Sequence, residues 1–327
     1  MTTLAIIGGG IAGRSLIYTL AKRKNIFSNI TLFDSDSFAR TCSLRSTAIV
    51  APRGVSAGHS DLGDLLLAAF QTFAQHVEED RPLGVFPITQ YTGAITKLDQ
   101  FKQRYPHGTS CKATASFNLR DETYLATDPA FMIETSTYLK WLLDEAAQLP
   151  IVVRNEFVTN LNDSGSDFEL TTQNGVSNRF DKVIFAGGFY NQYWGPTQAA
   201  KPVQGSYFEF LKTDFGSESF SLTLESDNLV YHALSKTLLI GSSSQNDSHE
   251  IPPMQDLKEI YSRLSQRLEL KLPPIDSGNI LTGIREKGPK RSPYISIDRN
   301  SARIGGFYKN GYSLGLHLGR ELIDQFS

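Results

Sequence analysis

Apolar residues in this chain occur both in short runs that suit strands and in longer stretches with helical spacing. Residues 4–7 and 30–33 are apolar runs typical of buried strands. Between them, residues 11–24 have helical spacing, and one face is formed by Leu16, Ile17, Leu20 and Ala21. This strand–helix–strand order predicts a βαβ unit at the start of the chain.

Strand and helix patterns continue in mixed order after this unit. We expect helices over residues 62–79, 134–148 and 254–268, and a last one from about residue 313. Strands are expected at 84–88, 93–97, 151–153, 183–185, 206–211, 229–233 and 237–240. β-rich stretches separate the segments of nucleotide-binding type. The pattern therefore predicts two interleaved domains rather than two successive βαβαβ halves.

The composition and charge of the chain argue against several classes of binding partner. A chain of 327 residues with net charge −2 carries no global attraction to nucleic acid or to a membrane surface. Its two cysteines, Cys42 and Cys111, form no CxxC pair, and the chain start resembles no secretory signal, so we expect a cytoplasmic protein. No apolar run approaches the length of a membrane span. The histidines lack metal-binding spacing, so no metal site is expected.

The turn after the first strand carries a nucleotide-binding fingerprint. Gly8, Gly10 and Gly13 form G-x-G-x-x-G between a strand and a helix, and Asp34 ends the second strand. Gly8 permits the tight turn, Gly10 lets a pyrophosphate approach the backbone, and Gly13 lets helix and strand pack closely. The helix start offers free N–H groups to phosphates, and Asp34 can bind a ribose diol. The motif allows either NAD or FAD, and an ordinary βα turn is the alternative.

Seven motifs in order resemble those of one family, the FAD-dependent D-amino acid oxidase, glycine oxidase and sarcosine oxidase group. The resemblance covers nearly the whole chain. GGGIAG resembles the family's FAD fingerprint, SLRSTAIV at 43–50 its flavin loop, and VIFAGG its second glycine motif. KPVQGSYF and LLIGSSS are similar to strands of its substrate sheet. TGIREKGPKRSPYIS and GGFYKNGYSLG are similar to its Gly-Leu-Arg-Pro segment and its C-terminal glycine turn.

The resemblance implies a fold and a cofactor. It implies a mixed α/β fold in which a Rossmann-like FAD-binding domain (residues 1–80, 131–200 and 284–327) is interleaved with an antiparallel substrate-binding domain (residues 81–130 and 201–283). The cofactor is expected to be noncovalent FAD, although Cys42 near the flavin loop makes attachment conceivable. The expected FAD-binding residues are Gly8, Gly10, Ile11, Ala12, Gly13, Asp34, Ser35, Arg45, Ser46, Thr47, Val158, Ala186, Gly187, Gly188, Gly283, Lys309, Asn310, Gly311, Tyr312 and Ser313.

Arg285 matches the family arginine that holds the substrate carboxylate. A guanidinium pairs with both carboxylate oxygens at once and so fixes the α-carbon near the flavin. A surface arginine beside Lys287, Lys290 and Arg291 is the alternative. Tyr207 and Tyr231 are expected to frame the pocket, although aromatic residues on strands often belong to the core. His232 should face away from Tyr231.

The chain departs from the family pattern around the expected substrate. Glu286 stands where proline is usual, Gln204 where arginine is frequent, and Phe307 near the usual histidine. Residues 46–48 also differ from the family's flavin loop. The basic residues after Arg285 would suit a second acid group on the substrate, but a solvated loop is the better interpretation.

Three functions remain open at this point. The leading one is oxidation of the C–N bond of an amine or small amino acid, with electrons passing on to oxygen or another acceptor. The second is a tRNA-modifying oxidoreductase that acts on a carboxymethylamino-uridine, against which the net charge of −2 argues. The third is a non-catalytic flavin-binding subunit. An oligomer is compatible with all three.

Overall fold

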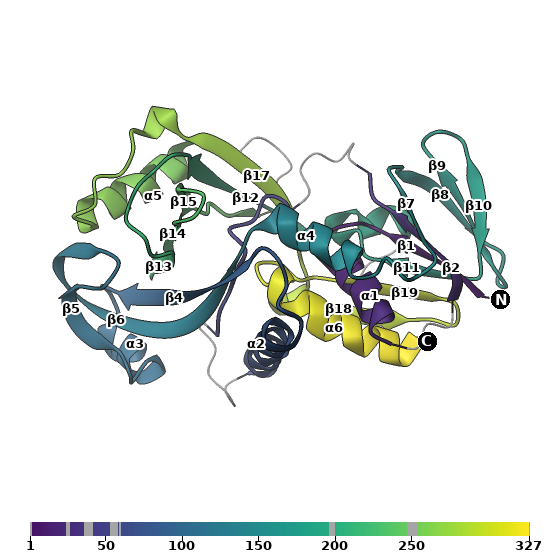
Figure 1. Cartoon of the computed structure of the whole chain (residues 1–327), viewed down its shortest axis with the longest axis horizontal. Coiled ribbons are helices and arrows are strands. Elements are labelled where there is room, and N and C mark those ends of the chain that lie inside the picture. Colours follow the sequence, from purple (N-terminus) through teal and green to yellow (C-terminus); the bar gives the residue numbers. More distant parts are fainter. Residues whose placement is uncertain are drawn as a thin grey trace.

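The chain forms two lobes that lie side by side (Figure 1). This computed structural model describes residues 2–23, 27–35, 42–52, 58, 60–195, 200–246 and 254–326. Both termini lie in one lobe, which contains a six-stranded sheet, and the other lobe contains a ten-stranded sheet. The mixed α/β fold class predicted from the sequence is confirmed.

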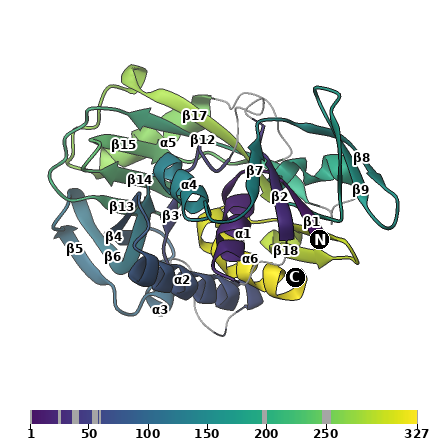
Figure 2. The same ribbon diagram turned by 45° about the vertical axis from the view of Figure 1, so that its right-hand side comes forward.

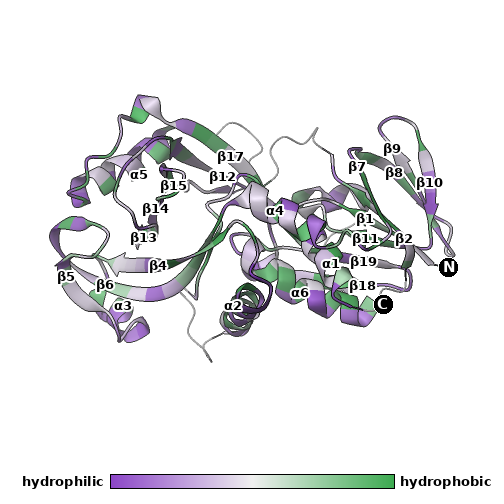
Figure 3. Ribbon diagram, viewed as in Figure 1, coloured by the Kyte–Doolittle hydropathy of each residue, from purple (hydrophilic) through white to green (hydrophobic). Residues whose placement is uncertain are grey.

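The six-stranded sheet has the order β18-β19-β11-β1-β2-β7. The strands are β1 (Thr2–Ile7), β2 (Phe27–Phe33), β7 (Ile151–Arg154), β11 (Lys182–Phe185), β18 (Tyr294–Ile297) and β19 (Ser301–Gly305). All neighbours are parallel except β18 and β19. β1 and β11 lie at its centre and are coloured mostly hydrophobic in Figure 3, as strands buried on both faces require.

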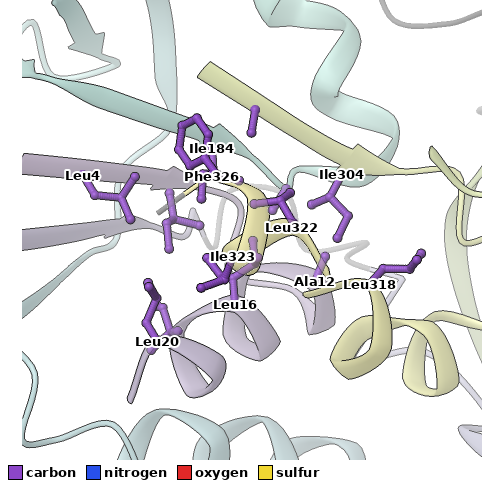
Figure 4. Packing of buried hydrophobic residues seen from close by; sticks show 14 of the residues in the cluster. Leu4, Ala12, Leu16, Leu20, Ile184, Ile304, Leu318, Leu322, Ile323 and Phe326 are labelled. Atoms are coloured by element: carbon purple, nitrogen blue, oxygen red, sulfur yellow. The ribbon is translucent and has the colours of Figure 1, made fainter. Parts of the chain in front are cut away.

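Helices α1 (Ile11–Ala21) and α6 (Gly311–Phe326) pack on one face of this sheet. Figure 4 shows Leu16 of α1 beside Ile323 of α6, and Leu20 and Leu322 belong to the same apolar cluster. All of these side chains are almost fully buried. The other face is covered by the antiparallel strands β8 (Val158–Asp163), β9 (Phe168–Thr172) and β10 (Ser177–Phe180). The sheet is therefore held between two apolar layers.

The ten-stranded sheet has the order β16-β12-β15-β14-β13-β4-β6-β3, with β17 beside β12 and β5 beside β6. Its strands are β3 (Ile49–Val50), β4 (Val85–Ala94), β5 (Thr109–Ala113), β6 (Asn118–Ile133), β12 (Lys201–Phe210), β13 (Phe220–Leu224), β14 (Asp227–His232), β15 (Thr237–Gly241), β16 (Gln245–Asn246) and β17 (Asn279–Lys287). One face packs against helix α5 (Met254–Arg267) through a large apolar cluster. The opposite face looks toward the first lobe.

Three further helices and three short 3-10 segments complete the described part of the chain. α2 (Asp61–Asp80) and α4 (Thr135–Asp144) lie near the junction of the lobes (Figure 2), and α3 (Leu98–Arg104) lies beside β5 and β6 of the second lobe (Figure 1). The 3-10 segments are η1 (Gly188–Trp194), η2 (Ile275–Ser277) and η3 (Pro289–Arg291). None of the helices in the described ranges has the length and apolar character to cross a membrane.

The structure corrects two details of the sequence prediction. The strands expected at 84–88 and 93–97 are one strand, β4, because residues 89–92 pair with both β6 and β13. β17 runs to Lys287, so it crosses the boundary expected between residues 283 and 284. Arg285 consequently lies on a strand of the ten-stranded sheet, paired with Val203.

Candidate functional site

A cavity of about 430 Å³ lies between the two sheets. Its walls come from the fingerprint turn, the loop at 42–51, the second glycine turn, β17 and the turn before α6. Most of the expected FAD-binding residues line it. These are Gly8, Gly10, Ile11, Ala12, Asp34, Ser35, Arg45, Ser46, Thr47, Val158, Ala186, Gly187, Gly188, Gly283, Lys309, Asn310, Gly311 and Tyr312. Gly13 and Ser313 lie behind this wall.

The fingerprint turn contains glycines at which any larger residue would force the neighbouring backbone to move. Gly8 has φ +113°, and a Cβ there would come within 2.6 Å of the Ala186 backbone. A Cβ on Gly13 would lie 1.9 Å from the Gly8 carbonyl oxygen, so this glycine lets α1 pack tightly under the turn. The start of α1 therefore faces the cavity with its free N–H groups.

The neighbouring loop supplies the cap that α1 lacks in its own sequence. Ser43 Oγ accepts a hydrogen bond from the Ile11 N–H at 3.0 Å. Tyr312, at the start of α6, donates its hydroxyl to the Ser43 carbonyl oxygen at 2.7 Å. Ser43 thus joins the starts of two helices whose N-termini both border the cavity, and their dipoles favour negative charge on a ligand there.

Asp34 lies at the end of β2 beside the fingerprint turn. Arg14 Nη2 donates to Asp34 Oδ2 at 2.9 Å, and Arg14 Nε donates to the Gly9 carbonyl oxygen at 2.7 Å. A Cβ on Gly9 would overlap the Asp34 carboxyl group. The carboxylate is therefore held at one place on the cavity wall, where a ligand diol would donate to it.

A buried network connects the two glycine turns on the opposite wall. Gly187 N–H donates to Asn191 Oδ1, and Asn191 Nδ2 donates to the Tyr294 hydroxyl. Tyr294 in turn donates to Glu286 Oε1 at 2.8 Å, and the Gly306 N–H donates to Glu286 Oε2 at 2.8 Å. Glu286 thereby ties β17 to the turn that precedes α6. Burial raises the pKa of Glu286 to about 7, although both hydrogen bonds oppose this shift.

Glu286 should make the protein less stable as the pH rises from about 5 to 7. Because its pKa is raised from 4.5 to about 7 in the folded chain, the native state holds a proton that the unfolded state has released. The stabilisation is complete below pH 4.5 and is lost as the pH passes 7. It amounts to about 3 kcal/mol at most. Glu286→Gln should remove this part of the pH dependence, measured by urea unfolding of the holoprotein at several pH values.

The exposed substitution Glu122→Gln serves as the matched control and should keep the wild-type pH profile. A Glu286→Gln profile parallel to that of the wild type would contradict the assignment of a neutral carboxyl group at this position.

Arg285 enters the cavity from β17. Its Nη2 donates to the Ser243 carbonyl oxygen at 3.1 Å, and its guanidinium lies 5.7 Å from the centre of the Tyr308 ring. No carboxylate forms a salt bridge with Arg285 within the described ranges. A Cβ on Gly205 would overlap the guanidinium, so this glycine leaves room for it. An anionic group on a ligand would find an uncompensated cation here.

The two predicted tyrosines lie on opposite faces of the same sheet. Tyr207 lines the cavity. Tyr231 does not, and its place in the pocket was wrongly expected. Its ring is fully buried in the apolar cluster against α5, and its hydroxyl donates to the Gly216 carbonyl oxygen. The side of the sheet that a residue faces depends on strand phase, which the sequence alone left open.

The basic residues after Arg285 are not part of the cavity. Lys290 and Arg291 are exposed on η3, and Lys287 Nζ donates to Asn246 Oδ1. Several cavity residues had no sequence signal, among them Gln90, Ser221 and Asn228. Within the described ranges, no three histidine, cysteine or acidic side chains are grouped as a metal site would require.

The geometry suits a long ligand with an anionic middle. The bare turn at residues 8–10, the two helix starts and Asp34 lie on one wall, and a Cβ at Gly188 would meet no atom within 4 Å. A dinucleotide needs this combination of exposed N–H groups, a diol acceptor and backbone without side chains. The remaining part of the cavity, near Arg285, is left for a second and smaller molecule.

Comparison with known proteins gives a consistent result. Residues 3–325 match the family described as FAD dependent oxidoreductase (DAO). Glycine oxidase from Geobacillus kaustophilus has a similar structure, with 18% identity, TM-score 0.80 and coverage of 100% of this chain and 95% of that one. Iminodiacetate oxidase from Chelativorans sp. BNC1 has 18% identity, TM-score 0.77 and coverage of 98% and 94%.

L-alpha-glycerophosphate oxidase from Mycoplasma pneumoniae, whose structure has FAD bound, has 15% identity, TM-score 0.82 and coverage of 100% and 95%. At these identities the likeness concerns the fold. No curated protein matches the sequence.

Proposed function

The chain belongs to the FAD-dependent oxidoreductase (DAO) family, and from this premise we propose that it oxidises the C–N bond of an amine or small amino acid. The chemistry that FAD would supply when bound is two-electron oxidation, with its N5 atom as the acceptor of the substrate's Cα hydride and with oxygen or another acceptor taking up the electrons afterwards. The observation that carries the proposal is Arg285, a cation without a carboxylate partner in the described residues, which borders the cavity beside the glycine turns.

The residues of the first lobe would hold the FAD. The pyrophosphate would lie against Gly8, Gly10 and the start of α1. Asp34 would bind the ribose of the adenosine half. The loop at 45–47 and the turn at 309–313 would lie along the flavin ring, where backbone N–H groups and the α6 dipole favour negative charge. On this basis residues 1–80, 131–200 and 284–327 would serve the cofactor, except that the end of β17, as far as Lys287, would join residues 81–130 and 201–283 in serving the substrate.

Arg285 would bind the carboxylate of the substrate and so fix the reacting carbon. The planar guanidinium is held by Ser243 and lies against Tyr308, so little of its conformational freedom remains to be lost on binding. Tyr207 borders the same space. Positioning by these groups would bring the substrate Cα–H toward the flavin.

FAD should leave the protein intact when the chain is unfolded. Cys42 lines the cavity, but burial raises the pKa of its thiol, although Arg285 opposes the shift. A neutral thiol is a poor nucleophile for attachment to a flavin. Acid precipitation should therefore leave the yellow colour in the supernatant, and the pellet should be free of flavin fluorescence. Flavin that stays with the pellet would contradict noncovalent binding.

An anaerobic screen tests the proposed reaction. Purified holoprotein is mixed with a panel of amines and amino acids, and the long-wavelength absorbance of the flavin is followed. We expect bleaching by at least one carboxylate-bearing amine and recovery of colour when an electron acceptor is added. If no member of a broad panel bleaches the flavin while dithionite does, the oxidase proposal fails. Retention on tRNA at physiological salt would instead favour the tRNA-modifying function.

A further inference from the structure

The cavity runs past the carboxyl ends of three neighbouring parallel strands of the first lobe. β1, β2 and β7 follow one another in the six-stranded sheet, and Figure 2 shows them side by side. The fingerprint turn follows β1, Asp34 follows β2, and Glu156 comes two residues after the end of β7. The Asp34 N–H donates to the Arg154 carbonyl oxygen at 2.9 Å, which holds the last two positions next to each other.

The order of these strands assigns the parts of a dinucleotide to the cavity wall. The phosphates would lie at the turn after β1, and the ribose diol would lie at Asp34, one strand further along the sheet edge. Neighbouring strands are about 4.8 Å apart, so each further strand reaches the next group of an extended ligand. The group that follows the ribose is the purine base. The wall after β7, which includes Glu156, would therefore face the base.

Two backbone carbonyl oxygens of this wall already accept hydrogen bonds from the protein. Phe157 and Val158 both line the cavity. The Phe157 carbonyl oxygen accepts from the Gln173 N–H at 2.8 Å, and the Val158 carbonyl oxygen accepts from Trp194 Nε1 at 2.9 Å. An amine of the base would have to share these acceptors with protein donors that are already in place.

The Glu156 carboxylate lacks such a donor. The carboxylates on the described cavity lining are Asp34, Glu156 and Glu286. Arg14 donates to Asp34, whereas Tyr294 and the Gly306 N–H donate to Glu286. Glu156 Oε2 is buried, and it has no hydrogen-bond partner in the described part of the chain. A buried acceptor without a donor costs stability, and a donor on the ligand would remove that cost.

The chemistry of a carboxylate limits the bases that fit here. An ionised carboxylate accepts hydrogen bonds and donates none. Adenine carries an exocyclic amine on its six-membered ring, whereas hypoxanthine and guanine carry a carbonyl oxygen at the same position. The amine would donate to Glu156, but the carbonyl oxygen would place a second acceptor against it. A site that leaves two acceptors facing each other rejects the wrong ligand.

We propose that Glu156 accepts a hydrogen bond from the exocyclic amine of the cofactor's adenine and so selects adenine over 6-oxo purines. Glu156 is thus a specificity-determining residue at the base end of the cavity, far along the sheet edge from the Arg285 region. The inference rests on the assignment of FAD to this cavity, and it does not depend on the proposed oxidation of amines.

An analogue of FAD in which hypoxanthine replaces adenine tests the proposal. The full-length apoprotein is titrated with FAD and with this analogue, and binding is followed by the change in flavin absorbance. Both compounds carry the same chromophore, so the signal does not depend on the base. We expect the analogue to bind roughly 10- to 100-fold more weakly than FAD, the effect of one hydrogen bond to a charged group.

Variants of Glu156 assign this preference to its carboxylate. Glu156→Gln keeps the size of the side chain, but its amide accepts from an amine in one orientation and donates to a carbonyl oxygen in the other. The ratio of the two dissociation constants should therefore fall to within about threefold. Glu156→Ala removes both functions and should also abolish the preference. Glu145→Gln, at the exposed end of α4, is the matched control and should keep the wild-type ratio.

The possible outcomes decide the proposal. Equal affinity of the wild type for the two compounds would overturn it. So would a Glu156→Gln protein that binds both compounds more weakly by the same factor, because the carboxylate would then act on the ribose or on folding. No amine is present in these titrations. A protein that discriminates between the bases but oxidises no amine would therefore keep this inference while the proposed function fails.

Discussion

Replacing Arg285 with alanine should raise the KM for a carboxylate-bearing substrate by roughly 30- to 4,000-fold while the flavin spectrum stays unchanged. Loss of one partner of a hydrogen-bonded charge pair costs about 2–5 kcal/mol, which corresponds to this range. The guanidinium is pre-positioned by the Ser243 carbonyl oxygen and the Tyr308 ring, so the wild-type residue loses little entropy on binding. Steady-state kinetics with the best substrate from the anaerobic screen measure the change.

Two further variants give this prediction its controls. Arg285→Lys retains the cation but not the planar fork, so its KM should lie between those of the wild type and the alanine variant. Lys287→Ala removes a cation two residues along the strand, whose Nζ binds Asn246 outside the cavity, and should leave KM unchanged. An Arg285→Ala enzyme with wild-type KM would remove Arg285 from the substrate site.

Gly13→Ala should abolish FAD binding, although alanine normally favours a helix over glycine by about 1 kcal/mol. The new methyl group would lie 1.9 Å from the Gly8 carbonyl oxygen, so α1 and the fingerprint turn must separate. The matched control is Gly319→Ala on α6, where the added Cβ meets Ser15 and Thr19 of α1 at 3.7 Å, an ordinary contact. This control should stay yellow and be slightly more stable.

Gly10→Val separates cofactor binding from folding. Gly10 has φ −72°, which any residue adopts, and an added Cβ would meet only the Ser43 side chain, at 2.9 Å. The protein should therefore fold, with a wild-type circular dichroism spectrum, but the side chain should block the approach of a pyrophosphate. Fluorescence titration of the apoprotein with FAD should show at least about 100-fold weaker binding. Wild-type affinity would contradict the assignment of the fingerprint to the phosphates.

Sequence reasoning succeeded where the signal was local. The fingerprint turn, α1, α2 and α5 follow from glycine spacing and helical periodicity within single segments, and the structure confirms them. It failed at β4, which was expected as two separate strands. The polar residue Gln90 interrupts the apolar alternation there, and it lines the cavity rather than packing into a core. The alternation of apolar and polar residues along β4 is thus interrupted where the strand borders the cavity.

Contacts between distant segments could not be read from the sequence. Hydrogen bonds connect Asn191, Tyr294, Glu286 and Gly306, which come from separate parts of the chain. No sequence motif predicts this network. Tyr207 and Tyr231 looked equivalent because the alternation along a strand does not say which face meets the cavity. Arg285 was predicted as a substrate-binding residue from the resemblance to a family, and the structure shows that it lies on β17.

Anaerobic stopped flow with an amino-acid substrate deuterated at Cα measures the proposed hydride transfer itself. We expect that the wild-type flavin is bleached in a single turnover, that deuterium slows this step, and that Arg285→Ala requires far more substrate for the same rate. A flavin that dithionite reduces but that no carboxylate-bearing amine reduces would contradict it, as would bleaching at equal substrate concentrations in the wild type and Arg285→Ala.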